Sequence, residues 1–177
     1  TYTGNIGVGQ DLRFVLEAAE KLSDNVKFCL IGDGDEKSEI QRAIEARGLG
    51  DRVLLYPIMD RLETVKYLMS GDLLLLNLLD TEAHREAIPS KIFEYTVIGR
   101  PIIAGLKGVA AEILLESKND VRVIRPSNAS DLVEIIVNFN AANETNVESN
   151  YHRFSRETQN NKLIDLAETI CKMKNRV

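Results

Sequence analysis

Long hydrophobic runs and an excess of positive charge are both missing from this sequence. No apolar stretch approaches the roughly 20 residues that a membrane-spanning helix needs. The 177 residues include 22 lysines and arginines against 27 aspartates and glutamates, a net charge of -5, whereas a dedicated nucleic-acid-binding protein needs a basic surface. With 44% apolar and 28% charged residues, the composition is ordinary for a globular chain with a hydrophobic core. We therefore expect a globular domain without a nucleic-acid partner.

Cysteine is also scarce. The two cysteines, Cys29 and Cys171, lie far apart, each in an apolar segment, so we expect two buried free thiols and a reducing, cytoplasmic location. The chain begins with Thr1 rather than Met, directly on a predicted strand. We interpret the sequence as a fragment of a longer protein.

Strands and helices alternate along the chain. Apolar segments predict strands at residues 1–3, 26–32, 52–57, 72–80, 101–105 and 121–126. Helical spacing and end signals predict helices at residues 11–22, 35–48, 62–71, 89–98, 109–117 and 129–139, the last with Ser130 as a candidate cap. The run "DLLLLNLLD" is typical of a strand buried on both faces of a parallel sheet. The pattern predicts an α/β fold with a Rossmann-like, doubly wound parallel six-stranded sheet.

This predicted domain covers residues 1–138. Residues 139–150 are polar and aperiodic, which predicts a linker or long loop. Residues 151–177 predict a C-terminal helix, with apolar side chains on one face at Leu163, Leu166, Ala167, Ile170 and Cys171.

Ligands of doubly wound sheets bind beyond the carboxyl ends of the strands, so the loops that leave the strands are the candidate sites. The first loop, "GNIGVG", has glycines at positions 4, 7 and 9 that would let backbone amides approach a phosphate. Its spacing is not the dinucleotide G-x-G-x-x-G, and no G-K-[ST] follows. A tight turn explains the same glycines equally well.

The second loop contains Asp33 and Asp35, a pair that could hold a divalent metal. The same residues suit a turn into a helix, where acids lie near the positive end of the helix dipole. No third acid or histidine stands at ligand spacing, so we predict the turn and no metal site.

The third loop, "REAIPSKIFEY", carries the clearest signal. Pro89 at a helix start puts Ser90 and Lys91 in the first turn, and Lys91 has the charge to bind a diphosphate. Glu94 lies on the same face one turn on, and one carboxylate can accept from two sugar hydroxyls. Glu86, before the helix, could reach another hydroxyl of the same ligand. Two solvated surface acids are the alternative, which the position after the most buried strand disfavours.

With seven residues between them, Glu86 and Glu94 match the E-x7-E motif of retaining GT-B glycosyltransferases. The chain resembles the carboxyl-terminal, donor-binding domain of the glycosyltransferase group 1 family (family 4). The pieces that occur in family order are "YTGNIG", "FCLIGDGDEKSEI", "DRVLLYP", "GDLLLLNL", "PSKIFEYTVIGRPIIA" and "FSRETQNNKLIDL". They cover nearly the whole chain. The "GNIG…Q" and "PSK…EY" variants look closest to bacterial members that build capsule, O-antigen or other cell-surface polysaccharides.

This resemblance implies a role for each motif. Glu86 would be the catalytic residue that contacts the transferred sugar, and Glu94 would bind the ribose hydroxyls of the donor. The residues implied to bind the donor nucleotide are Gly4, Asn5, Gly7, Gly32, Gly34, Tyr56, Ile58, Ser90, Lys91 and Glu94. The donor would be a UDP-sugar. No metal or other cofactor would be required, because helix amides and basic side chains stabilise the leaving diphosphate.

The resemblance also implies partners outside this chain. A GT-B enzyme has two such domains, so an amino-terminal, acceptor-binding domain is missing here, and the C-terminal helix would pack back toward it. We therefore expect this fragment alone to transfer no sugar. The acceptor would be a glycan or a lipid-linked sugar, and the full-length enzyme could associate peripherally with a membrane through its other domain.

Some positions depart from the family pattern. Asn5 and Gln10 stand where members usually place basic residues, which leaves Lys91 as the close cation and predicts weaker donor binding. Ala87-Ile88-Pro89 replaces the usual Phe-Gly. Two alternatives remain: a sugar-nucleotide 2-epimerase, for which His84 and His152 are poor acid/base candidates, and a non-catalytic nucleotide-binding module, which only the E-x7-E pair opposes.

Overall fold

The computed structural model describes residues 1–117 and 119–139, and it contains every strand and helix predicted for that part of the chain. The strands are β1 (Tyr2–Asn5), β2 (Phe28–Asp33), β3 (Val53–Tyr56), β4 (Leu74–Asn77), β5 (Ile102–Gly105) and β6 (Val121–Val123). The helices are α1 (Arg13–Lys21), α2 (Lys37–Ala46), α3 (Arg61–Ser70), α4 (Glu82–Arg85), α5 (Lys91–Ile98), α6 (Val109–Leu115) and α7 (Ala129–Val137). Helix α4 and a 3-10 turn, η1 (Val8–Gln10), were not predicted. The predicted C-terminal helix and nearly all of the predicted linker lie outside the described residues.

All strand pairs are parallel, but the strands form two three-stranded sheets, ordered β1-β2-β3 and β4-β5-β6. The predicted single six-stranded sheet is therefore not confirmed. The two sheets meet where β1 and β4 lie side by side. There, Thr1 donates to the carbonyl of Leu73 at 2.7 Å and accepts from the amide of Leu75 at 2.9 Å.

A tyrosine explains why this pairing stops after Thr1. Alternate residues of a strand direct their amides to the same side, so the amide of Thr3 faces β4, as that of Thr1 does. The Thr3 amide donates instead to the hydroxyl of Tyr95 at 3.0 Å. Tyr95 comes from α5 and is fully buried. Its hydroxyl thus takes the place of a backbone partner at the junction of the two sheets.

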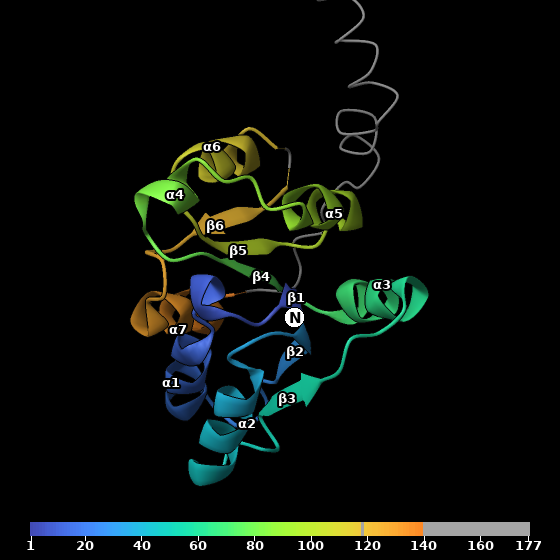
Figure 1. Cartoon of the computed structure of the whole chain (residues 1–177), viewed down its shortest axis with the longest axis vertical. Coiled ribbons are helices and arrows are strands. Elements are labelled where there is room, and N and C mark those ends of the chain that lie inside the picture. Colours follow the sequence, from blue (N-terminus) through green and yellow to red (C-terminus); the bar gives the residue numbers. More distant parts are fainter. Residues whose placement is uncertain (118, 140–177) are drawn as a thin grey trace, which may run out of the picture.

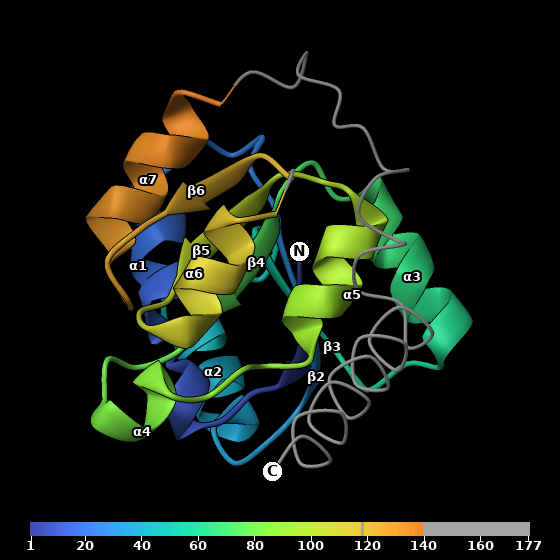
Figure 2. The ribbon, with the colours of Figure 1, turned by 90° about the horizontal axis from the view of Figure 1, so that it is seen from above.

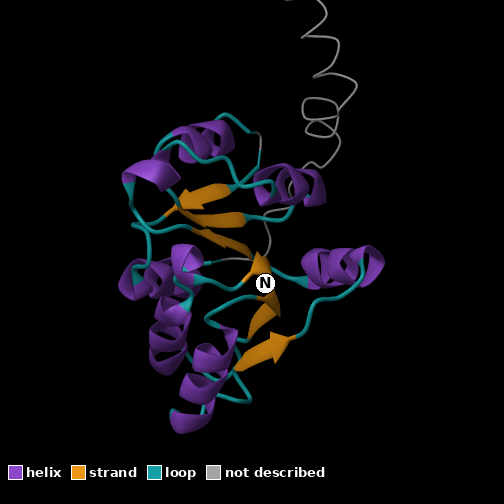
Figure 3. Cartoon of the chain, viewed as in Figure 1, coloured by secondary structure: helices purple, strands orange, loops and turns teal. Residues whose placement is uncertain are grey.

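Helices cover both faces of the strands, as Figures 1 and 3 show. Helices α1, α2 and α7 lie on one side, and α3 and α5 lie together on the other, an arrangement that the view from above repeats (Figure 2). Two hydrophobic clusters fill the layers between helices and strands. Strand β4 is buried along its whole length, as its uninterrupted apolar run predicted.

Local signals set several helix ends. Asp60 caps α3 by accepting the amide of Glu63 at 2.9 Å, and Gly99 ends α5 in the left-handed conformation, with φ of 75°. The predicted Ser130 cap is wrong: Asn128 caps α7, because its side chain accepts the amide of Asp131 at 2.9 Å. No helix in the described ranges is long and apolar enough to cross a membrane.

The cysteine prediction can be compared at one of its two positions. Cys29 is a free thiol on β2, but it is only partly buried. Cys171 lies outside the described residues.

Candidate functional site

The three predicted loops meet at a cleft of about 610 Å³ beyond the carboxyl ends of β1 and β2. The start of α5 forms its other wall. The predicted site residues that line it are Gly4, Asn5, Gly32, Ile58, Ser90, Lys91 and Glu94. The folding rule for doubly wound sheets and the loop signals therefore indicate the same place.

Two glycines allow the strands and α5 to approach one another here. A Cβ atom at Gly32 would lie 1.8 Å from the carbonyl oxygen of Gly4, and Gly32 has a φ of +153°. Gly4 has a φ of +113°, and a Cβ atom there would lie 2.6 Å from Cε of Lys91. Side chains at either position would displace the neighbouring strand or Lys91. Close packing therefore explains these glycines as well as ligand binding does.

Lys91 is the cation of the cleft. Its Nζ donates to the hydroxyl of Tyr2 and lies 4.0 Å from the centre of the Tyr2 ring. The Tyr2 hydroxyl in turn donates to the carbonyl of Asn5. Burial lowers the pKa of Lys91 to about 8, although the nearby Glu94 carboxylate acts in the opposite direction. Burial also raises the pKa of Tyr2, which therefore stays a neutral phenol.

Glu94 is half-buried on the same wall, on the turn that follows Lys91. Among the described residues neither side chain forms an ion pair, although ten salt-bridge contacts occur elsewhere. Within the described part of the chain, a carboxylate and an ammonium are thus presented to one cleft without an ion-pair partner. Such groups can bind a ligand that carries both hydroxyls and an anion.

Asp33 takes part in the turn of the second loop. The Asp33 carboxylate accepts the amide of Gly34 at 3.0 Å, and Nζ of Lys37 holds the carbonyls of Gly32 and Tyr56 at 2.6 and 3.1 Å. Within the described residues, no group of three or more histidine, cysteine or acidic side chains is arranged to hold a metal. The turn that we predicted is therefore present.

Four predicted residues do not line the cleft: Gly7, Gly34, Tyr56 and Glu86. The Tyr56 ring packs against that of Tyr67, with centroids 5.2 Å apart. Gly34 lies against the carbonyl of Ile6. Glu86 is exposed at the end of α4, a short helix whose start is capped by Thr81.

The surroundings of Glu86 hold a small charged network that sequence reasoning missed. Asp80, just after β4, accepts from Nε of Arg85 at 2.7 Å and from Nζ of Lys107 at 2.5 Å. These two hydrogen bonds lower the pKa of Asp80 to about 2. The ring of His84 donates from Nδ1 to the carbonyl of Leu79 at 3.0 Å. The network ties the loop after β4 to the loop after β5.

Tyr2 is the other residue that the sequence analysis did not single out. A usable signal was present, because residues two apart on a strand share a face and Tyr2 therefore lies on the same face as Gly4. A gap left by the glycine can admit a side chain that reaches the tyrosine. The sequence does not predict that this side chain is Lys91, which lies 89 positions away.

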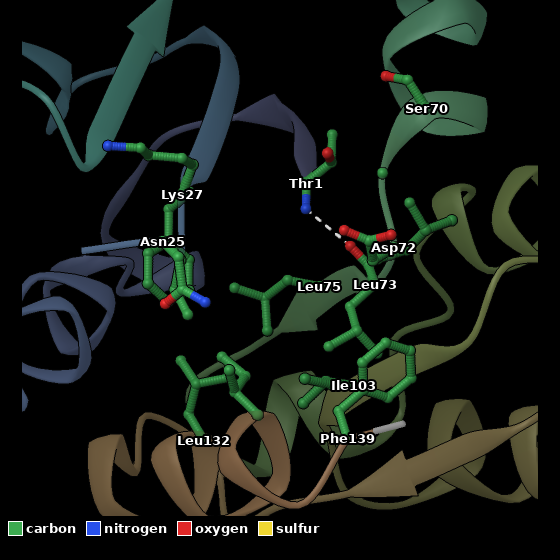
Figure 4. A pocket seen from close by; sticks show the side chains of 15 residues that line it. Thr1, Asn25, Lys27, Ser70, Asp72, Leu73, Leu75, Ile103, Leu132 and Phe139 are labelled. Carbon is green, nitrogen blue, oxygen red and sulfur yellow. Dashed lines mark hydrogen bonds between the residues drawn. The ribbon is translucent and has the colours of Figure 1, made fainter. Parts of the chain in front are cut away.

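A second cavity, of about 440 Å³, lies at the opposite, amino-terminal edge of the strands (Figure 4). Its polar lining residues include Thr1, Asn25 and Asp72, and its apolar wall includes Leu132 and Phe139. The amino group of Thr1 is bonded to the backbone of Leu73 there. We assign the functional site to the other cleft, since ligands of this architecture bind at the carboxyl ends of the strands.

Comparison with known proteins identifies the family. The family model described as "Glycosyl transferases group 1" matches residues 2–160. The chain belongs to this family. The glycosyl transferase group 1 assignment that the motifs indicated is thereby confirmed.

Curated relatives of this group 1 chain are themselves glycosyltransferases by name. The chain is 25% identical over 139 residues to alpha-D-kanosaminyltransferase of Streptomyces kanamyceticus, covering 76% of this chain and 34% of that protein. It is 30% identical over 99 residues to the putative colanic acid biosynthesis glycosyl transferase WcaI of Escherichia coli K12, covering 55% of this chain and 24% of that one. The chain thus spans about a third or less of the curated relatives it matches.

Solved structures share the fold of this group 1 chain. Anabaena Alr3699/HepE, crystallised with UDP and glucose, aligns with a TM-score of 0.74 at 20% identity, over 94% of this chain and 48% of that one. TarM of S. aureus aligns with a TM-score of 0.71 at 20% identity, over 93% of this chain and 35% of that one. At these identities the likeness shows the α/β fold, which agrees with the predicted class.

Proposed function

We propose that this chain is the donor-binding domain of a retaining glycosyltransferase that transfers a hexosyl group from a nucleoside-diphosphate sugar. The observation that carries the proposal is the pair formed by Lys91 and Glu94, which face one cleft without ion-pair partners in the described part of the chain. A nucleoside diphosphate offers the matching groups, an anionic diphosphate and two ribose hydroxyls. Family membership supports the same ligand class.

In this proposal each residue has a simple task. The Lys91 ammonium and the positive end of α5 hold the diphosphate, and Glu94 accepts from the ribose hydroxyls. The aliphatic side chain of Ile58, which is exposed in the cleft, lies against the base. UDP is the expected nucleotide, because the Anabaena protein was crystallised with UDP and with UDP-glucose, and TarM with UDP.

Transfer replaces the bond between the anomeric carbon and the diphosphate oxygen with a bond to an acceptor hydroxyl, whose proton is released, so negative charge develops on the leaving diphosphate. A cation placed beside that oxygen stabilises the charge as it forms, which assigns this part of catalysis to Lys91. We propose that Glu86 contacts the transferred sugar. The acceptor, a glycan or lipid-linked sugar of a cell-surface polysaccharide, binds another domain, so this chain alone binds donor without transferring sugar.

Calorimetric titration of the 177-residue chain with UDP, GDP, ADP and NAD tests the proposal. We expect one nucleoside diphosphate to bind and Glu94→Ala to weaken it at least about tenfold, because hydrogen bonds to a charged group are lost. Glu17→Ala is the matched control, since Glu17 is an exposed helical glutamate on α1 away from the cleft, and it should bind as the wild type does. Addition of EDTA should change nothing, because Lys91 and helix amides supply the positive charge. Equal affinity of the Glu94→Ala variant and the wild type would refute the assignment.

A further inference from the structure

Tyr2 holds Lys91 in two ways, through its ring and through its hydroxyl. Nζ of Lys91 lies 4.0 Å from the ring centroid and donates to the phenolic oxygen. Because the hydroxyl uses its own proton on the carbonyl of Asn5, only its lone pairs face the ammonium. Tyr2 is 1% exposed and does not line the cleft, so it acts on a ligand only through Lys91.

Gly4, on the same face of β1 as Tyr2, also contacts the Lys91 side chain. A Cβ atom at Gly4 would lie 2.6 Å from Cε and 3.0 Å from Nζ of Lys91, so the side chain runs directly over the glycine. Contact with Gly4 and Tyr2 leaves Lys91 little rotamer freedom. A lysine that is already ordered before a ligand arrives loses less conformational entropy when it binds.

Among the residues that the structure describes, no carboxylate forms an ion pair with Lys91. Its ammonium is partly buried, and the charged group that faces it is Glu94, three positions along α5, which forms no ion pair with it. Burial lowers the pKa of Lys91 to about 8. An anion bound in the cleft would therefore stabilise the charged form of this desolvated ammonium.

We propose that Tyr2 is a positioning residue of the donor site, whose ring and hydroxyl fix the Lys91 ammonium at the cleft wall, ready to bind a diphosphate. This inference rests on the proposed donor-binding function and deepens it. The Lys91 ammonium donates one hydrogen bond to Tyr2, and its other N–H groups remain for the ligand. Tyr2 on β1 and Lys91 on α5 therefore act together to bind the diphosphate.

A double-mutant cycle on the 177-residue chain tests this unit, with UDP as the ligand in calorimetry. We expect Tyr2→Phe to weaken UDP binding about tenfold, the effect of one hydrogen bond to a charged group. Lys91→Met keeps the aliphatic contact and should weaken binding further. In the Lys91→Met background Tyr2→Phe should have no additional effect. An equal loss in both backgrounds would overturn the proposal.

Tyr67→Phe is the matched control. It also removes a tyrosine hydroxyl, but the Tyr67 ring packs on Tyr56 and neither residue lines the cleft, so UDP affinity should stay within about twofold. The pH profile gives a readout that a purely structural role would not move. Wild-type affinity should fall above about pH 8 as Lys91 loses its proton, earlier in Tyr2→Phe, and not at all in Lys91→Met. A Tyr2→Phe profile identical to that of the wild type would count against the proposal.

The ligand-free chain separates this proposal from the proposed function. If wild-type chain binds no nucleoside diphosphate, the donor-binding function fails. The contact between Tyr2 and Lys91 is then still measurable, by NMR of the Lys91 side chain. We expect the Tyr2 ring to shift the Lys91 Cε protons upfield, because Nζ lies 4.0 Å from the ring centroid, and ordinary lysine shifts would overturn the proposal even if Tyr2→Phe did not fold.

Discussion

Replacing Asn77 with alanine should loosen the edge of the fold on which the cleft is built. Asn77 ends β4 and is 3% exposed. Its Nδ2 donates to the carbonyl of Gln10 at 2.8 Å and to Oγ of Ser127 at 3.1 Å, and its Oδ1 accepts the amide of Ser127 at 2.9 Å. A Cβ atom at Gly105 would lie 2.1 Å from Oδ1, so the amide group fills its site. One side chain thus joins β4 to loops from both halves of the chain.

The expected cost follows from these three bonds. Each contributes about 1 kcal/mol net, so the free energy of unfolding should fall by roughly 3 kcal/mol. For a chain of this size each kcal/mol shifts Tm by about 2–4 °C, which predicts a Tm lower by roughly 6–12 °C. The cleft should be affected too, because Gln10 accepts from the side chain of Asn5 at 2.8 Å.

Urea unfolding followed by circular dichroism would measure the change, with Tm from calorimetry. Asn138→Ala is the matched control, because Asn138 is exposed at the end of α7 and, within the described residues, its side chain donates only to the carbonyl of Glu134. Its effect should stay within about 0.5 kcal/mol. A loss below about 1 kcal/mol in Asn77→Ala would refute the reasoning, since it would mean that water replaces all three bonds.

Two further variants test the packing and the charges around the cleft. Gly32→Ala should fail to fold or lose several kcal/mol in urea unfolding, because its Cβ atom would overlap β1, whereas Gly50→Ala, which meets nothing within 4 Å, should change stability by less than about 1 kcal/mol. The pKa of Asp80 is lowered to about 2 by Arg85 and Lys107, so its stabilisation is present above about pH 4 and lost as pH falls toward 2. Lys107→Met should reduce this pH dependence of stability between pH 2 and 5, and an unchanged slope would show that the pairing does not matter.

The fold class could be predicted because its signals are local. Six apolar segments separated by helical patterns describe an α/β chain, and the uninterrupted run around β4 marks a strand buried on both faces. The division into two sheets could not be predicted, because the contacts at their junction are long-range, such as the bond between Thr3 and Tyr95, 92 positions apart. Helix α4 was missed because its four residues are too few to show a helical period.

The part of the site that lies at strand ends and at a helix start could be predicted from the sequence. Gly4 and Gly32 lie at the carboxyl ends of strands, Lys91 and Glu94 lie at the start of a helix, and all four line one cleft. Tyr56 also follows this rule, yet its ring packs on α3 instead. Side-chain direction depends on tertiary neighbours, which the position in a loop does not determine.

The bond between Thr3 and Tyr95 makes one backbone amide a natural reporter of the site. Lys91 and Glu94 lie on the same helix as Tyr95, so any displacement of α5 has to stretch or break this bond. The amide proton of Thr3 is buried and has the Tyr95 hydroxyl as its acceptor. Its exchange with deuterated solvent therefore records how firmly α5 is seated, without a label and without a ligand.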